Sequence, residues 1–246
     1  MTAPEQLVDL FERPFQPTQT RDATDSERAA NLAAGQHISS ALTMEVPYGQ
    51  EIQNSVDAAR WAATHHASNA LCDHLADKLP TSLGYKRLRS SMPKTTPVPI
   101  RNYRQRGASS RTDGFLDAVA NNATALALGQ VLFHGGAWEP GATPTQLQFP
   151  LSTSFCPEMA LRNAAWGGKA WASGYVNLLH IRVSSHDVRG FVCSLRSTKG
   201  HENEVILAQG TLLTAMAAEE ISPIYVGSMD GSSKMVPVRL VFVEAV

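Results

Sequence analysis

Cysteine is scarce in this chain, with Cys72, Cys156 and Cys193 the three among 246 residues. An odd number of widely spaced cysteines does not build the disulfide framework of a small secreted domain. The cysteines show no Cys-x-x-Cys spacing and the histidines no His-x-x-x-His pair, so no metal site is expected. We therefore interpret the cysteines as buried or free thiols in a reducing compartment.

Long hydrophobic runs are also missing. No apolar stretch approaches the roughly 18–20 residues that span a bilayer, so no membrane segment is expected. Residues 1–21 carry acidic residues and prolines in place of the apolar core of a secretory signal. The expected location is the cytoplasm, either of the cell that makes the protein or of a target cell after delivery.

Acidic residues are absent from one long segment, residues 78–111, although the net charge of the whole chain is only −1. The basic residues of this segment are Lys78, Lys86, Arg87, Arg89, Lys94, Arg101, Arg104, Arg106 and Arg111. The segment is either a solvated basic face on a linker or an anion site for a pyrophosphate or a nucleic acid. Composition alone leaves both interpretations open.

Helix-like segments followed by strand-like runs predict an α+β fold. The hydrophobic fraction of 43% is enough for a core. Helical spacing is expected over residues 25–42, 54–80, 100 onward and 113–128. Residues 44–53 read as a turn. From residue 131 the period shortens to strand-like runs, broken by one helix over 157–171. The runs are 131–134, 149–154, 176–183, 190–195, 203–208, 222–226 and 236–244.

Three prolines between residues 90 and 100 make this stretch the best linker candidate. The chain is therefore expected to divide into residues 1–97, a mostly helical extension with a flexible start, and residues 98–246, a strand-rich domain.

Three short elements in a fixed order carry the strongest functional signal. They are Leu132-Phe133-His134-Gly135-Gly136, Leu151-Ser152-Thr153-Ser154 and His201-Glu202-Asn203-Glu204-Val205-Ile206-Leu207. Together they resemble the NAD-binding and catalytic elements of the mono-ADP-ribosyltransferases, a family of toxins, bacterial effectors and phage modifying enzymes. The resemblance covers roughly residues 98–246. It implies an ADP-ribosyltransferase-like split β-sandwich with a preceding helical region, and it places His134 where most members with a Ser-Thr-Ser strand have Arg.

The Glu-x-Glu element is expected to supply the catalytic carboxylates. The resemblance assigns Glu204 to stabilise the oxocarbenium-like transition state and to bind the ribose 2′-hydroxyl. The alternation of a strand would put Glu202 and Glu204 on one face, with Glu202 orienting the incoming nucleophile or acting as its base. The alternative is a pair of solvated carboxylates on an edge strand.

The Ser-Thr-Ser strand is expected to support the catalytic carboxylate. Ser152 and Ser154 share a face, so Ser152 can reach Glu204 while Ser154 holds neighbouring backbone. The resemblance implies that Ser152, Thr153 and Ser154 all belong to the NAD site, and that Ser152 also serves catalysis.

His134 and Gly135 are expected to complete the NAD site. The resemblance implies that the backbone at Gly135 pairs with the nicotinamide carboxamide, which a Cβ would obstruct. His134 would hold a ribose hydroxyl through a neutral imidazole, so the pyrophosphate needs another cation. The candidates are Arg162 and an arginine of residues 101–111. Alternatively, His134 is a core histidine in an inactive protein.

The resemblance implies an NAD-dependent transferase that moves ADP-ribose to a macromolecule and releases nicotinamide, with NAD as co-substrate and no metal. Members with Glu at the first position of Glu-x-Glu modify arginine, so an arginine on a target protein is the first expectation. A nucleic acid acceptor, bound through residues 78–111, is a second possibility. Two alternatives stay open: an NAD glycohydrolase on the same fold, and a nucleic-acid-binding or regulatory protein with a degenerate NAD cleft.

Overall fold

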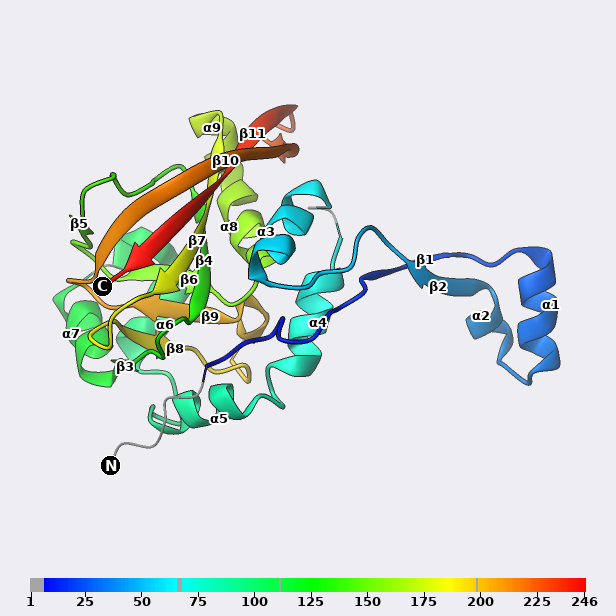
Figure 1. Ribbon diagram of the computed structural model, residues 1–246, viewed down its shortest axis with the longest axis horizontal. Helices are drawn as coiled ribbons and strands as arrows, with labels where there is room; N and C mark the ends of the chain where they lie inside the picture. Colours follow the sequence, from blue (N-terminus) through cyan, green and yellow to red (C-terminus); the bar gives the residue numbers. More distant parts are fainter. Residues whose placement is uncertain (1–6, 66–67, 111, 198) are drawn as a thin grey trace.

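The computed structural model describes residues 7–65, 68–110, 112–197 and 199–246. Helices dominate the first half of the chain and one large sheet dominates the second (Figure 1). The expected α+β fold class is confirmed. Among the described residues, no helix has both the length and the apolar composition needed to cross a membrane.

The large sheet has nine strands in the described residues, in the order β3-β8-β9-β6-β4-β7-β11-β10-β5. Only β7 and β11 pair in parallel; every other pair is antiparallel. Each of the seven strand-like runs expected from the sequence overlaps one of these strands. Their bounds are Thr124–Ala125 (β3), Val131–Gly136 (β4), Thr145–Gln146 (β5), Leu151–Ser154 (β6), Val176–Val183 (β7), Arg189–Val192 (β8), Glu204–Leu207 (β9), Leu212–Gly227 (β10) and Ser233–Ala245 (β11).

The sheet is almost divided between β4 and β6. These strands share a single pair of opposite residues, Phe133 and Ser154. By contrast, β4 pairs with β7 along its whole length, and β6 does the same with β9. The narrow junction fits the split sandwich expected from the sequence. It also brings the ends of β4 and β6, which carry two of the three sequence elements, next to each other.

The helices of the main body are α3 (Ser55–Thr64), α4 (Ala70–Lys78), α5 (Leu83–Ser90), α6 (Val98–Arg106), α7 (Asp113–Asn122), α8 (Pro157–Ala165) and α9 (Lys169–Ser173), with short 3₁₀ turns η1 (Gly107–Ser110), η2 (Trp166–Gly168) and η3 (Gly200–Glu202). Three expected helices of the main body were too long. The helix over 113–128 ends at Asn122, because residues 124–125 pair with β8 as strand β3. The helix over 54–80 is two helices, because the Ser68 hydroxyl accepts the Ala70 amide and starts α4 afresh. The helix over 157–171 ends at Ala165, because Gly167 and Gly168 have φ angles of 65° and 73°.

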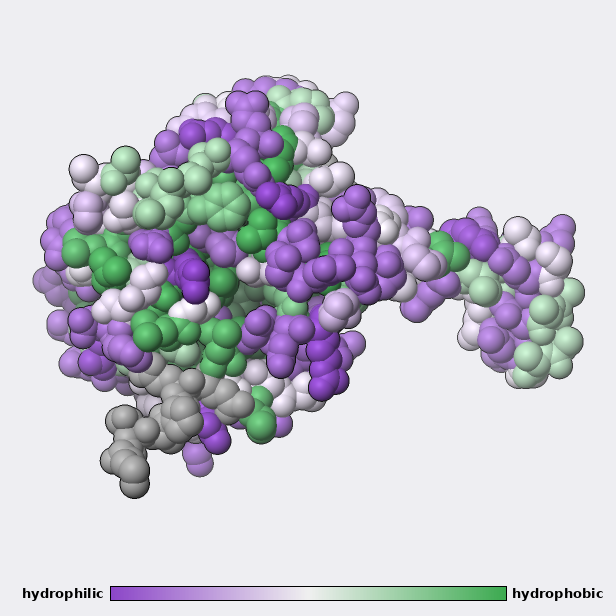
Figure 2. Space-filling view, in the orientation of Figure 1, coloured by the Kyte–Doolittle hydropathy of each residue, from purple (hydrophilic) through white to green (hydrophobic). Residues whose placement is uncertain are grey.

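An arm projects from the main body (Figures 1 and 2). It consists of β1 (Thr18–Asp22), α1 (Asp25–Ala33), α2 (Ile38–Ala41) and β2 (Thr43–Pro47), with β1 and β2 paired antiparallel. The single helix expected over 25–42 is broken at Gly35, whose φ of 80° no helix accommodates. The turn expected from residue 44 is partly strand β2. The flexible start expected before residue 24 falls partly on residues 1–6, which lie outside the described residues.

The helices that precede residue 97 share one hydrophobic core with the sheet. Leu71 and Leu75 of α4 belong to the same buried cluster as Ile100 of α6 and Leu178 of β7. Helix α3 packs against both β10 and α8. A division at residue 97 into an extension and a catalytic domain therefore stays a prediction, and the helices on either side of this boundary support the same sheet.

Candidate functional site

The carboxylate of Glu204 is held at both oxygens by side chains from other parts of the chain. The Ser152 hydroxyl donates to Oε1 at 2.5 Å, and Nε of Arg104 donates to Oε2 at 2.5 Å. The thiol of Cys193 also donates to Oε2, at 3.4 Å. Burial, followed by the nearby Glu204 carboxylate, raises the pKa of Cys193 well above its usual range, so the thiol keeps its proton. All these groups therefore act as donors to the Glu204 carboxylate.

The register of two strands explains the contact between Ser152 and Glu204. Glu204 lies opposite Ser154 in the antiparallel pair of β6 and β9, so Ser152 is its diagonal neighbour on the same face. The Ser154 hydroxyl donates to the Glu202 carbonyl at 2.7 Å and accepts the Cys156 amide. Thr153 points to the opposite face, is buried, and donates to the Val205 carbonyl at 2.6 Å. The contact expected for Ser152 is present in the structure; its catalytic role stays a prediction.

The expected placement of Glu202 on a strand with Glu204 was wrong. Glu202 ends the 3₁₀ turn η3, and β9 begins only at Glu204. Asn203 between them has a φ of 49°, a left-handed conformation that breaks the alternation of a strand. Both carboxylates nevertheless line the same cleft. Glu202 has an ion pair with Lys199 at 3.3 Å and lies 3.8 Å from the Arg104 guanidinium.

His134 lies across the narrow junction of the sheet from Ser152. Its Nδ1 lies 2.7 Å from the Ser152 carbonyl oxygen. Because a carbonyl only accepts, this nitrogen carries the proton and donates. The bond fixes the imidazole ring beside the strand that supports Glu204.

Gly135 has a packing reason to be glycine. A Cβ at this position would lie 2.1 Å from the Ala160 carbonyl oxygen and 3.1 Å from the Cβ of Ala164. Strand β4 therefore approaches the backbone of helix α8 too closely for any side chain. The expected role of Gly135 in binding nicotinamide stays a prediction beside this structural requirement.

The contact of Arg104, on α6, with the Glu204 carboxylate was not predicted from the sequence. Besides the bond to Glu204, its guanidinium donates to the Ser197 hydroxyl at 2.8 Å and to the Lys199 carbonyl at 2.6 Å. It is buried, and it joins α6 to the loop that leads into β9. Arg104 and Glu204 are 100 residues apart in sequence. The excess of arginine in residues 101–111 was the only signal, and it predicted a phosphate ligand.

A cleft of about 570 Å³ contains these groups. Its walls include three aromatic side chains, and its cations are more numerous than its two carboxylates. The aromatic residues are Tyr103, Phe133 and Trp166, and the cations are Arg104, Arg106, Lys169 and Lys199. Since Arg104 and Lys199 are paired with the carboxylates, Arg106 and Lys169 are, among the described residues that line the cleft, the cations left to meet an anionic ligand.

The structure places Arg162, predicted to meet a pyrophosphate, away from this cleft. Arg162 forms an ion pair with Glu158 at 2.8 Å and also donates to Ser68 and Asn69, at the start of α4. The residues that line the cleft do not include Arg162. The helix α8 carries the cleft residues Ala160 and Asn163, and the side chain of Arg162 points from the same helix toward α4.

Three described arginines of the basic segment 78–111 have different surroundings. Arg104 is buried against Glu204, whereas Arg106 lines the cleft. Arg89 donates to the carbonyls of Pro93 and Lys94 and shapes the connection between α5 and α6. Arg111 lies outside the described residues. Of these three, Arg104 and Arg106 belong to the cleft and Arg89 has a local structural role.

No protein-family model matches the chain, and no curated protein sequence matches it. Several solved structures are similar to it. Vis toxin, an ADP-ribosyltransferase from Vibrio splendidus, is 15% identical over 92% of this chain and 88% of that protein, with a TM-score of 0.30. The enzymatic component C2-I of the C2 toxin from Clostridium botulinum is 10% identical over 94% and 55%, with a TM-score of 0.34.

A further similar structure is BECa, an ADP-ribosylating toxin of a binary enterotoxin of C. perfringens, solved with NADH. It is 11% identical over 82% of this chain and 53% of that protein, with a TM-score of 0.31. At these TM-scores the likeness is distant, and the geometry of the cleft carries the functional interpretation.

Proposed function

We propose that this chain is a mono-ADP-ribosyltransferase that moves ADP-ribose from NAD to a macromolecular acceptor, the first candidate being an arginine side chain of a target protein. The observation that carries the proposal is the carboxylate of Glu204, held between Ser152 and Arg104 in a cleft that also contains His134. A carboxylate so fixed is suited to one kind of chemistry, the stabilisation of a positive charge that develops nearby.

Glu204 supports the breaking of the bond between nicotinamide and ribose. As this bond breaks, positive charge builds on the ribose ring, and a carboxylate beside it lowers the barrier. The hydroxyl of Ser152 and the guanidinium of Arg104 fix the carboxylate before NAD binds, so no reorganisation is needed in the transition state.

The cleft has the groups that NAD requires. The indole of Trp166, 76% exposed at the wall of the cleft, suits stacking with a nicotinamide or adenine ring. Arg106 and Lys169 suit the pyrophosphate. His134 lines the cleft, is oriented by its hydrogen bond to the Ser152 carbonyl, and suits a ribose hydroxyl.

Glu202 is assigned to the acceptor. Its side chain is 16% exposed, compared with 6% for Glu204, so it is the more accessible of the two carboxylates. Its ion pair with the half-exposed Lys199 shows that the position attracts a cation. An acceptor guanidinium would take the place of the Lys199 ammonium and present its nitrogen to the ribose.

Labelled NAD separates this proposal from its alternatives. The full chain is incubated with NAD labelled in the ADP-ribose part and with whole-cell lysate, and the products are then digested with protease or with nuclease. We expect label in macromolecules that protease releases and nuclease does not. Nicotinamide release without labelled macromolecules would indicate a glycohydrolase. Label released by nuclease would indicate a nucleic acid acceptor, and no consumption of NAD would overturn the proposal.

A further inference from the structure

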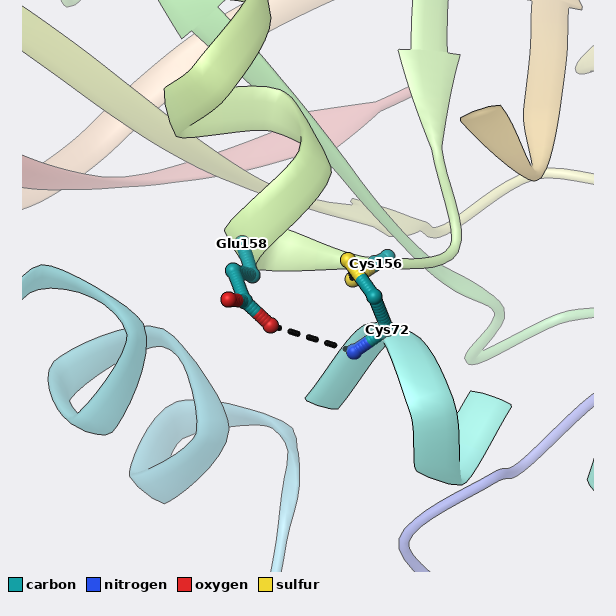
Figure 3. A group of neighbouring side chains, drawn as sticks. All are labelled: Cys72, Cys156 and Glu158. Carbon is teal, nitrogen blue, oxygen red and sulfur yellow. Dashed lines mark hydrogen bonds between the residues drawn. The ribbon is translucent and has the colours of Figure 1, made fainter. Parts of the chain in front are cut away.

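Two of the three cysteines lie side by side outside the cleft. Sγ of Cys72, on α4, is 3.6 Å from Sγ of Cys156, the residue before α8 (Figure 3). Cys156 is fully buried, whereas Cys72 is partly exposed. The two residues are 84 positions apart in sequence, so only the fold brings them together.

The buried carboxylate of Glu158 is the third member of this cluster, and its ligand atom and the two sulfurs all lie within 4.8 Å of one another. This spacing would permit a metal ion, but the partners of the carboxylate argue against one. One oxygen accepts the Cys72 amide at 3.1 Å, and the other accepts the Arg162 guanidinium at 2.8 Å. A guanidinium on the carboxylate repels a divalent cation, and among the described residues no further His, Cys, Asp or Glu joins the group.

We propose that Cys72 and Cys156 form a reversible disulfide that ties α4 to the strand supporting the catalytic carboxylate. Cys156 follows strand β6 directly, and its amide donates to the Ser154 hydroxyl at 3.0 Å. Ser154 in turn holds the backbone of Glu202. A bond at Cys156 therefore joins the helices before residue 97 to the corner of the sheet on which the cleft is built.

The bond forms by exchange with a small-molecule disulfide. The thiolate of Cys72, the more accessible sulfur, attacks the oxidant, forms a mixed disulfide and releases one thiol. The sulfur of Cys156 then displaces the second thiol, so two protein thiols are oxidised and one disulfide is reduced to two thiols. The hydrogen bond with Cys156 and burial both raise the pKa of Cys72. Exchange should therefore be slow at neutral pH and faster at alkaline pH.

The test is a count of free thiols in the full chain. The protein is treated with excess oxidised glutathione at alkaline pH, quenched in acid, unfolded and alkylated, and its labelled thiols are counted and mapped by mass. We expect three labelled thiols in the reduced protein and one, at Cys193, after oxidation. A linked peptide pair should contain Cys72 and Cys156. Three free thiols after oxidation, or a link through Cys193, would overturn the proposal.

Matched variants sharpen the result. Cys193→Ser should lose both of its remaining thiols on oxidation, as the wild type loses the same two. Cys72→Ser and Cys156→Ser should form no internal link.

The Tm of the wild type should rise by roughly 5 °C or more on oxidation, because the bond closes a long loop. An unchanged Tm would contradict a disulfide that ties α4 to β6. Retention of one equivalent of added zinc chloride by the wild type, but by neither Cys72→Ser nor Cys156→Ser, would overturn the disulfide proposal in favour of a metal site. None of these readouts depends on NAD turnover, so they stand apart from the proposed transferase activity.

Discussion

Ser152 and Glu204 lie on neighbouring antiparallel strands, and the Ser152 hydroxyl donates to the Glu204 carboxylate across a distance of 2.5 Å. The same carboxylate accepts Arg104 at its other oxygen. One side chain comes from each of three separate parts of the chain. The contact therefore depends on the complete fold, and changes at each member should have different consequences.

Ser152→Ala should reduce NAD turnover while leaving the fold intact. The substitution removes one hydrogen bond to a charged group, worth about 1.5–3 kcal/mol, so the rate should fall roughly 10- to 150-fold. Thr211→Val is the control, because the hydroxyl of the buried Thr211 also donates a hydrogen bond, to the Ala208 carbonyl at 2.9 Å, and Thr211 is not among the residues that line the cleft. It should lower the free energy of unfolding by about 1 kcal/mol and leave turnover unchanged. Equal turnover in Ser152→Ala and the wild type would remove Ser152 from the mechanism.

Arg104→Ala should lower both stability and turnover. Removing one partner of a buried ion pair typically costs about 3–5 kcal/mol, because the other charge stays buried. Arg106→Ala is the control from the same helix. Since Arg106 lines the cleft, it should raise the Michaelis constant for NAD without changing the Tm. Urea unfolding and steady-state kinetics measure both effects, and the same profile in the two variants would show that Arg104 has no special relation to Glu204.

His134→Ala should weaken NAD binding more than it slows the chemical step. The imidazole is held by the Ser152 carbonyl, and the proposed contact with a ribose hydroxyl acts in the bound state. Calorimetric titration with NAD measures the affinity directly. His134→Arg, which restores the residue that most members with a Ser-Thr-Ser strand have, is the comparison. Unchanged affinity in His134→Ala would leave this histidine a structural residue.

His180 should make the fold sensitive to acid. It lies in β7, its Nε2 is 2.9 Å from the Ser55 hydroxyl oxygen, and burial lowers its pKa from 6.5 to about 4. Because the unfolded chain binds the proton more readily, stability is full above pH 6.5 and falls as the pH drops toward 4. The loss amounts to about 3 kcal/mol. In His180→Gln this contribution should be absent, and urea titrations across this pH range measure the difference. An equal pH slope in both proteins would contradict the assignment.

The order of the strands along the chain could be predicted from the sequence, because each strand depends on a local pattern of residues. The mainly apolar run of residues 176–183 predicted β7 with its full bounds, because a strand buried on both faces needs a run of this kind. The shared face of Ser152 and Ser154 followed from the period of a strand. These features depend only on neighbours in sequence.

The contacts made by the site residues could not be predicted from the sequence, because they join residues that are distant along the chain. Arg104 reaches Glu204 only through the packing of α6 against the loop before β9. Glu202 was expected on a strand but ends a 3₁₀ turn, because Asn203 after it has a left-handed conformation. Few sequence patterns indicate a positive φ at a residue other than glycine. The sequence showed that Arg162 is a cation, but it did not show which side of α8 its side chain would face.

Glu204→Gln tests the central claim most directly. Glutamine has nearly the same shape: its single oxygen can accept from Arg104 while its amide nitrogen donates to the Ser152 hydroxyl, but it has no charge to stabilise the transition state. We predict that the release of nicotinamide from NAD falls at least about 100-fold, which corresponds to about 3 kcal/mol, in a protein that still shows a cooperative unfolding transition. Wild-type release of nicotinamide by a folded Glu204→Gln variant would contradict the account.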